Sequence, residues 1–351
     1  MGDEDGHAGG LMADVFSAGS TALNVSDYDI EEHCGQHDLL TINGTVKSLA
    51  AEIGKPAALQ IDQGAYSRKI VGYIDTQATS MGRNRETFDA VYVLGASSVM
   101  RSGGERKWKA KRPFDIASEI VRPYGFCLEM DKYEYTIPLF AQSAESDWQL
   151  LNRLAAEIGM ALIGTNTVIR MVDPVREIRR RKLRPLNTVD IRTLTDYNIS
   201  QSPVPLGYEG RVFQGVDRFR KTFSVTANPN ATIVLPAPET VRSLEDALSA
   251  AERIERRRHR MKRATCSMSF MPVLRSGTTL ALTNGSDTRV WFIVESRHIS
   301  TGNDKVRTYL VLNRDDDDDR TAVDAWRGSQ WPEPVLMDNQ WVSSIRWERE
   351  L

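Results

Sequence analysis

The chain of 351 residues has no long apolar run and no strong excess of charge of one sign. No stretch approaches the roughly 18 consecutive apolar residues of a transmembrane helix, so the sequence predicts no membrane span. The acidic, glycine-rich start MGDEDGHAGG is the reverse of a secretory signal, which begins with basic residues and continues with an apolar segment. We therefore expect a protein that stays in the cytosol until it is assembled into something larger.

Cysteine is also scarce. Cys34, Cys127 and Cys266 lie far apart and form no CxxC pair, a pattern typical of three reduced, buried thiols. The net charge of −2 excludes a global field that would attract nucleic acid. Arginine supplies 34 of the 45 basic residues, and its planar guanidinium suits ion pairs at interfaces.

Motifs of catalysis and cofactor binding are missing as well. The sequence holds no GxGxxG or GxxxxGK[ST] phosphate loop and no evident Ser-His-Asp or Cys-His grouping. His33, Cys34 and His37 resemble a metal site, but zinc needs three or four converging ligands, so we interpret them as a strand end and a turn. The five aspartates at 315–319 lack the pattern of a calcium loop. The sequence therefore predicts no catalytic, cofactor-binding or metal site, and no enzyme.

The basic run RIERRRHRMKR at residues 253–263 raises the possibility of phosphate binding. Glu252 and Glu255 alternate with its arginines on a helix with an apolar stripe, and the aromatic residues of single-strand binders are missing. A solvated or subunit-contacting helix is the favoured interpretation.

With 41% apolar residues, the chain has enough material for about two or three compact modules. Residues 1–24 are rich in glycine, alanine and serine and predict a flexible N-terminal arm. Short strand patterns then follow without a long helix, which predicts a small antiparallel barrel or sandwich with a polar connector over residues 25–111. The expected strands are residues 28–33, 38–43, 57–62, 67–78 and 87–94.

Residues 112–186 combine helix and strand patterns and predict an α+β module. Pro113 suits the first position of a helix that ends near residue 121. Ser146 and Gln149 have the spacing of a capping box, and Gly159 supplies a left-handed stop. Other expected features are an apolar stripe through Trp148, Leu151, Ala155 and Ile158, strands at 134–139, 160–163 and 167–172, and a charged link at 175–184.

Strands resume in a second β-barrel module over residues 187–314, with a helical insertion at 243–262. Residues 315–351 predict an acidic hinge and a C-terminal tail. That tail holds Trp326, Trp331, Trp341 and Trp347 but too few aliphatic residues for its own core, so these indoles need a partner surface. The expected strands are residues 188–194, 197–201, 208–216, 219–225, 264–272, 278–282, 290–299 and 305–312.

Three phrases resemble the tail-hub family of bacteriophages, which includes late control protein D and the spike hub of type VI secretion. The first is SDWQLLNRLAAEIG with the hairpin after it. The others are YDIEEHCGQHDLLTI at residues 28–42 and ESRHISTGNDKVRTYLVLNR at residues 295–314. The order of modules is similar too: a mainly β chain with two small antiparallel barrels separated by an α+β module.

The resemblance implies a structural baseplate protein at the virion tail tip, made in the host cytoplasm. In that family, three chains with two barrels each form a pseudo-sixfold ring. The homotrimer joins a tail tube or distal tail protein on one face to a central fibre or spike on the other, and DNA passes without sequence-specific binding. The tryptophans would dock onto such a fibre or distal protein, or fold back on their own chain. A virion-associated cell-wall hydrolase is the alternative function.

Overall fold

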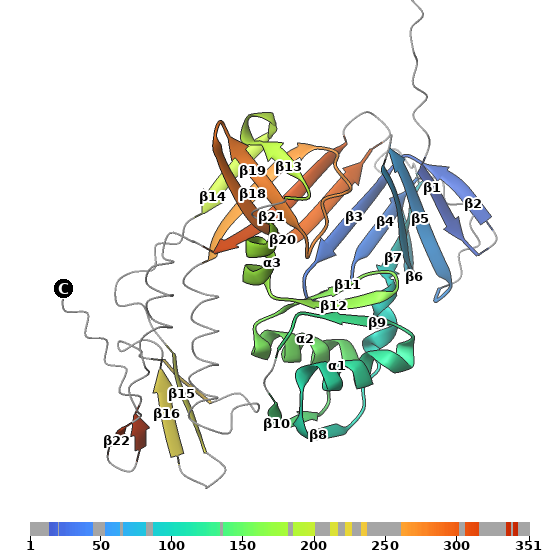
Figure 1. Ribbon diagram of the computed structural model, residues 1–351. Helices are drawn as coiled ribbons and strands as arrows, with labels where there is room; N and C mark the ends of the chain where they lie inside the picture. Colours follow the sequence, from blue (N-terminus) through green and yellow to red (C-terminus); the bar gives the residue numbers. More distant parts are fainter. Residues whose placement is uncertain are drawn as a thin grey trace, which may run out of the picture.

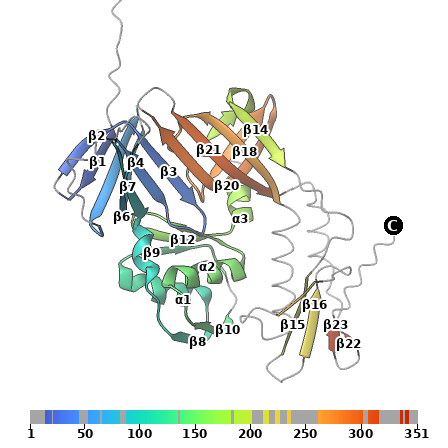
Figure 2. The ribbon, with the colours of Figure 1, turned by 180° about the vertical axis from the view of Figure 1, so that it is seen from behind.

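The structure is a computed structural model of the chain. It describes residues 14–19, 21–44, 53–63, 66–81, 87–133, 136–181, 185–200, 211–216, 222–226, 233–236, 261–301, 306–315, 335–337 and 340–342. Two curled β modules lie side by side, and an α+β module packs beneath them (Figure 1). The view from behind shows the same contact of the α+β module with both β modules (Figure 2). The expected mainly β fold with an α+β insert is confirmed.

The first β module has seven antiparallel strands in the order β3-β4-β7-β6-β5-β1-β2. Alternating side chains from these strands fill one core, in which Phe16, Ile30 and Leu59 are fully buried. All five expected strands are present. The arm expected at residues 1–24 is wrong for its second part, because residues 14–18 and 21–25 form a hairpin that extends the sheet. The strands are β1 (Asp14–Ala18), β2 (Thr21–Val25), β3 (Tyr28–His33), β4 (Leu39–Asn43), β5 (Pro56–Gln63), β6 (Tyr66–Met81) and β7 (Thr87–Gly95).

The α+β module begins earlier than expected. Residues 106–111, expected in a connector, form β8 and pair with β10, so they belong to this module. The expected charged link is largely a helix, α3. The elements are η2 (Ala96–Arg101), β8 (Arg106–Lys111), α1 (Pro113–Val121), η3 (Arg122–Tyr124), β9 (Cys127–Met130), β10 (Ile137–Gln142), α2 (Asp147–Ile158), β11 (Ala161–Gly164), β12 (Val168–Val172) and α3 (Pro174–Arg181).

Helix α2 is built as its sequence predicts. The Ser146 side chain accepts from the Gln149 amide while the Gln149 side chain accepts from the Ser146 amide, which completes the capping box. Gly159 ends the helix at φ +88°, in the left-handed region that favours glycine. Trp148, Leu151 and Ile158 face the module's core, where α2 packs against α1.

The second β module has the central strand order β14-β18-β21-β20-β19-β13. Its core contains Trp291, Leu280 and Leu312, all nearly inaccessible to solvent. The chain leaves this module after β14 and returns at β18. The elements are β13 (Thr188–Asp190), η4 (Ile191–Thr193), β14 (Asp196–Ser200), β18 (Met261–Ser269), β19 (Thr279–Asn284), β20 (Asp287–Ser300) and β21 (Arg307–Asp315).

The excursion between β14 and β18 is not part of this barrel. Two strands expected within the barrel instead join a separate five-stranded sheet, in the order β17-β15-β16-β23-β22. The expected helix at residues 243–262 lies outside the described residues up to residue 260, and its last two residues begin β18. Asp315 of the expected acidic hinge ends β21. The strands of the separate sheet are β15 (Arg211–Val216), β16 (Thr222–Thr226), β17 (Ile233–Pro236), β22 (Val335–Met337) and β23 (Gln340–Val342).

The two β modules are copies of one pattern. In the first, β3 pairs with β4, β4 with β7, β7 with β6, and β6 with β5. In the second, β14 pairs with β18, β18 with β21, β21 with β20, and β20 with β19. All eight pairings are antiparallel. The outermost strands differ, since β1 is antiparallel to β5 whereas β13 is parallel to β19.

The register repeats as well. In the first module Ile74 faces Val93, and after a bulge Thr76 faces Tyr92. In the second, Ile293 faces Leu312, and after a bulge Glu295 faces Val311. The bulge therefore falls at the same place in the long strands β6 and β20, and this fixes a residue-by-residue correspondence between the two modules.

Candidate functional site

The functional feature that the structure builds best is the joint between the two β modules. The long strand β20 takes part in both β modules. Its first half pairs with β19 of the second module, and residues 295–300 pair along the same edge with β3 of the first module. The bulge between Ile293 and Glu295 separates the two halves. This pairing merges the β modules into one continuous sheet.

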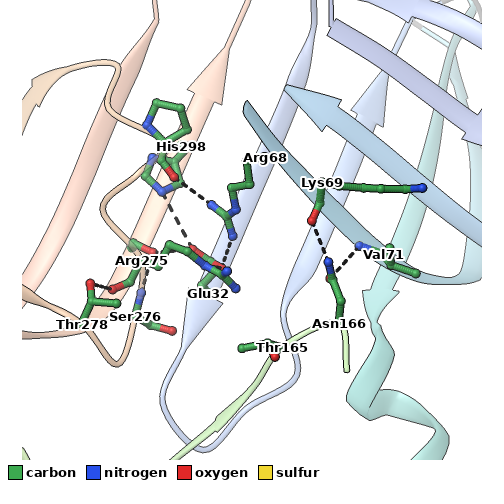
Figure 3. A network of polar contacts seen from close by, with 12 residues as sticks. Glu32, Arg68, Lys69, Val71, Thr165, Asn166, Arg275, Ser276, Thr278 and His298 are labelled. Atoms are coloured by element: carbon green, nitrogen blue, oxygen red, sulfur yellow. Dashed lines mark hydrogen bonds and ion pairs between the residues drawn. The ribbon is translucent and has the colours of Figure 1, made fainter. Parts of the chain in front are cut away.

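A buried ion cluster fastens the joint (Figure 3). Glu32 of β3, only 1% exposed, accepts from Arg68 of its own module and from Nε of Arg275 in the second module at 3.1 Å. The hydroxyl of Ser296 on β20 donates to the other Glu32 oxygen at 3.0 Å. Arg68 also donates to the Pro272 carbonyl at 3.1 Å. The one carboxylate thus contacts charged or polar groups of both modules.

Electrostatics keep this carboxylate ionised. Burial raises the pKa of Glu32, but the Arg68 and Arg275 guanidiniums outweigh it and lower the pKa to about 2. His298, fully buried with Nε2 at 3.9 Å from Glu32, has its pKa lowered to about 4 by burial. Burial and the Glu32 charge raise the pKa of Asp38 instead. At neutral pH the cluster therefore holds an ionised Glu32 and a neutral His298.

This arrangement suits structure rather than catalysis. A general acid or base must exchange a proton near the working pH and reach a substrate. Glu32 is saturated by cationic and hydroxyl donors and closed off from solvent. Its physical role is to hold the two modules in one orientation.

The α+β module contacts the same joint and is hydrogen-bonded to the first β module. The turn between β11 and β12 places Asn166 against β6, where its amide accepts from the Val71 N–H at 2.9 Å and donates to the Lys69 carbonyl at 2.7 Å (Figure 3). Trp148 of α2 donates to the carbonyl of Gly35, two residues after β3, at 3.1 Å. These contacts fix the module to the first barrel.

Contact with the second barrel is equally close. Gly277 adopts φ +74°, and a Cβ placed there would lie 2.5 Å from Cγ1 of Ile163 in β11. Ile163, with Ile178 of α3, packs into an apolar cluster with Val290 and Phe292 of β20. The three modules therefore form one unit around the β3–β20 pair.

A concavity of about 570 Å³ opens over β14, β18, β21, β20 and β3. Its lining includes Glu31, His33, Glu295 and Arg297, which alternate with the buried residues of the joint along β3 and β20. His33 lies 3.7 Å from a Glu295 oxygen, and Arg297 lies 3.2 Å from Glu31. At this surface the Glu31 charge is thus paired with Arg297, and the His33 ring lies beside Glu295.

The residues singled out in the sequence lie in different places. His33 ends β3, Cys34 donates its backbone N–H to Val294, and His37 pairs with Ser97 at 2.9 Å. Burial lowers the pKa of His37 to about 4. Over the described part of the chain, no three His, Cys, Asp or Glu residues are grouped as metal ligands. The expectation of three buried thiols is wrong for Cys127, which is exposed, and Cys34 is only partly buried.

Of the four tail tryptophans, only Trp341 lies among the described residues. Its backbone belongs to β23, which pairs in parallel with β16 at Phe223. Trp326, Trp331 and Trp347 lie outside the described residues, as does most of the basic run at 253–263. Docking by the tryptophans remains a prediction.

The joint between the two β modules was not predicted from the sequence, although one short sequence repeat marks the duplication of the β module. The segment Asp27-Tyr28-Asp29-Ile30, at the start of β3, corresponds to Asp196-Tyr197-Asn198-Ile199 of β14; Asp27 lies directly before β3. The local bonds match too: Asn43 donates to the Asp27 carboxylate at 3.0 Å, and its counterpart Ser267 donates to Asp196 at 3.0 Å. Comparing the two β regions would have found this repeat.

Solved structures share this architecture. A tail protein from Neisseria meningitidis MC58 is 13% identical at a TM-score of 0.63, with 87% of this chain and 96% of that chain covered. The 43 kDa tail protein of prophage MuSo2 from Shewanella oneidensis is 12% identical at a TM-score of 0.62, covering 86% and 97%. An Escherichia coli type VI secretion component, described as similar to the T4 tail proteins gp27 and gp5, is 12% identical at 0.57, covering 85% and 76%.

No protein-family model and no curated protein matches the sequence. Among the described residues, no helix is long and apolar enough to cross a bilayer. The similarity therefore lies in the fold, over most of both chains in each comparison. The chain has the fold of these phage tail and type VI secretion proteins.

Proposed function

We propose that this protein is a structural tail hub of a bacteriophage. Three chains form a ring of six barrel modules, which joins a hexameric tail tube to a threefold fibre or spike at the tail tip. The matched register of the two β modules carries the proposal. Because each chain holds two like barrels, three chains can present six similar faces to a sixfold tube while keeping threefold symmetry.

The fold of the similar tail proteins supports the same role. The chain would be made in the host cytoplasm and built into the virion, with the tube or distal tail protein on one face and the fibre or spike on the other. DNA would pass through the lumen without sequence-specific contact. The net charge of −2 suits such passage, since a strongly basic ring would bind the phosphates.

The proposed role is not enzymatic. The buried carboxylate of the joint is held by its arginine partners, and Glu31 and Glu295 at the concavity are paired with Arg297 and His33. Zymography on peptidoglycan tests the hydrolase alternative. A clearing zone that disappears in the Glu295→Gln variant would contradict the structural role.

The C-terminal tail is proposed to dock the fibre or a distal protein through Trp326, Trp331 and Trp347, because indoles are favoured anchors at interfaces. Trp341 lies in a strand that pairs with the chain's own inserted sheet, which places part of the tail beside this sheet. A variant ending at Asp315 should still trimerise but should no longer hold the purified fibre or spike of the same virion.

Native mass spectrometry of the full chain, alone and with the purified tube protein, tests the hub directly. The expected species contains three chains, either in isolation or once the tube protein is added. A protein that stays monomeric in both settings would contradict the proposal.

A further inference from the structure

The exposed residues of helix α3 are all arginines. Arg176, Arg179 and Arg180 are spaced by three and four residues, so they lie on one side of the helix and form what we call the arginine stripe. On the buried side, Ile178 packs with Phe292 of β20. Figures 1 and 2 show α3 between the second β module and the α+β module. The exposed face of α3 at this boundary is therefore strongly basic.

Neighbouring carboxylates compensate this charge only in part. Arg180 pairs with Asp131 at 2.9 Å and with Glu177 at 3.3 Å. Arg176 donates to a backbone carbonyl, a neutral acceptor, at 3.3 Å. Within the residue ranges that the structure describes, no carboxylate pairs with Arg176 or Arg179. Arg176 also lies in the first turn of α3, where the helix dipole disfavours a positive charge. Two cations of the stripe are therefore available to an acidic partner.

A run of aspartates begins beside the same helix. Strand β21 ends at Asp315, opposite Met261 of β18, and residues 316–319 are aspartates too. Two residues before this end, Asn313 faces Phe292, the β20 residue that packs with α3. Helix α3 contacts β21 as well as β20. The acidic run, residues 316–319, is therefore joined to the described chain next to α3.

We propose that the arginine stripe is the docking site of the acidic run of the same chain. Four residues reach at most about 14 Å, which exceeds the length of about 12 Å that the eight residues of α3 span. A guanidinium binds a carboxylate through two parallel hydrogen bonds, so arginine suits this contact. Docking replaces repulsion within each set of like charges by attraction between the two sets. The contact does not depend on the chain being a tail hub.

The covalent link to β21 favours this occupant over an acidic segment of another protein. A short link keeps the effective concentration of the acidic run at the stripe in the millimolar range. Another cationic partner within the chain is the basic run at 253–263, which leads into β18. That run contains Glu255, and Arg263 at its end lies 3.9 Å from Glu295, so part of its charge already has an acidic neighbour. Docking on α3 directs the start of the C-terminal tail toward the α+β module.

Carbodiimide coupling in the full chain tests the contact, because this reagent joins a carboxylate to an amine only where the two groups touch. The variant Arg179→Lys keeps the positive charge of the stripe and supplies an amine. Arg307→Lys is the matched control, since Arg307 is exposed too but lies at the other end of β21 from Asp315. Peptide mass spectrometry should find residues 316–319 coupled to position 179 at least about fivefold more than to position 307 in the control, with most of this excess lost at 1 M salt, where the Debye length is about 3 Å. Adding Arg176→Gln should lower the yield at position 179.

An equal mixture of unlabelled and heavy-isotope chains shows whether coupling occurs within one chain. Salt-sensitive coupling at position 179, confined to chains of one label, supports the docking. Equal coupling in the two variants, or a yield that salt does not change, overturns it. Coupling of the acidic run to Lys262 in place of position 179 overturns it in favour of the basic run. Coupling between light and heavy chains overturns the contact within the chain. The hub is tested separately, by the trimer measurement.

Discussion

Replacing Glu32 by glutamine removes the carboxylate that Arg68 and Arg275 both contact, at nearly constant volume. Arg68 is 6% exposed and would keep the Pro272 carbonyl as its polar partner at the joint. Removing one partner of a buried ion pair typically costs about 3–5 kcal/mol, because a charge is left uncompensated. We expect a loss of this size, a large fraction of the roughly 5–15 kcal/mol that stabilises a typical domain.

Urea unfolding at pH 7, followed by the fluorescence of buried tryptophans such as Trp291, measures the effect. Glu31→Gln is the matched control. It lies next to Glu32 on the same strand, is partly exposed and pairs with Arg297 at 3.2 Å, so its loss should cost less than about 1 kcal/mol. Equal losses in the two variants would refute the assignment of Glu32 as the charge that holds the joint.

The pH dependence provides a second check. The pKa of Glu32 is lowered to about 2 in the folded protein from 4.5, so its stabilisation is present above pH 4.5 and is lost as the pH falls toward 2. The wild type should therefore lose its advantage over Glu32→Gln across this window, by about 3 kcal/mol. A difference that stays constant from pH 6 to pH 2 would contradict the ionised state.

Further predictions concern the packing and the buried histidine. Gly277→Ala should destabilise the protein by about 2–4 kcal/mol in urea unfolding, because the new Cβ would strain the backbone and clash with Ile163 of the α+β module. The control Gly285→Ala has a similar φ of +61° but open space around it, so it should cost only about 1 kcal/mol. Burial lowers the pKa of His298 to about 4, so the stability that depends on its neutral form falls as the pH drops from 6.5 to 4. His298→Gln should reduce this fall by up to about 3 kcal/mol. An unchanged pH dependence in the variant would contradict a neutral, buried His298.

The sequence predicted local structure well wherever the chemistry was local. The capping box at Ser146 and Gln149, the left-handed Gly159 and the strand pattern of β3 to β7 depend on residues close together in the chain. The strand at residues 106–111 was missed because its partner β10 supplies the reason for its extended form, and a sequence window does not contain that partner.

The joint between the two β modules could not be predicted from the sequence for the same reason. Glu32 and Arg275 are 243 positions apart and meet only because β3 lies beside β20. His298 packs against Phe270 of its own module, with ring centroids 6.0 Å apart, but its charged neighbour Glu32 comes from the other module. The two inserted strands β15 and β16 looked like barrel strands because strand patterns do not specify which sheet they enter.

Cryo-electron microscopy of the assembled protein tests the central claim most directly. Two matched barrels per chain predict a threefold particle with six barrel densities around a lumen. A particle with another symmetry, or a ring with another number of barrels, would contradict it.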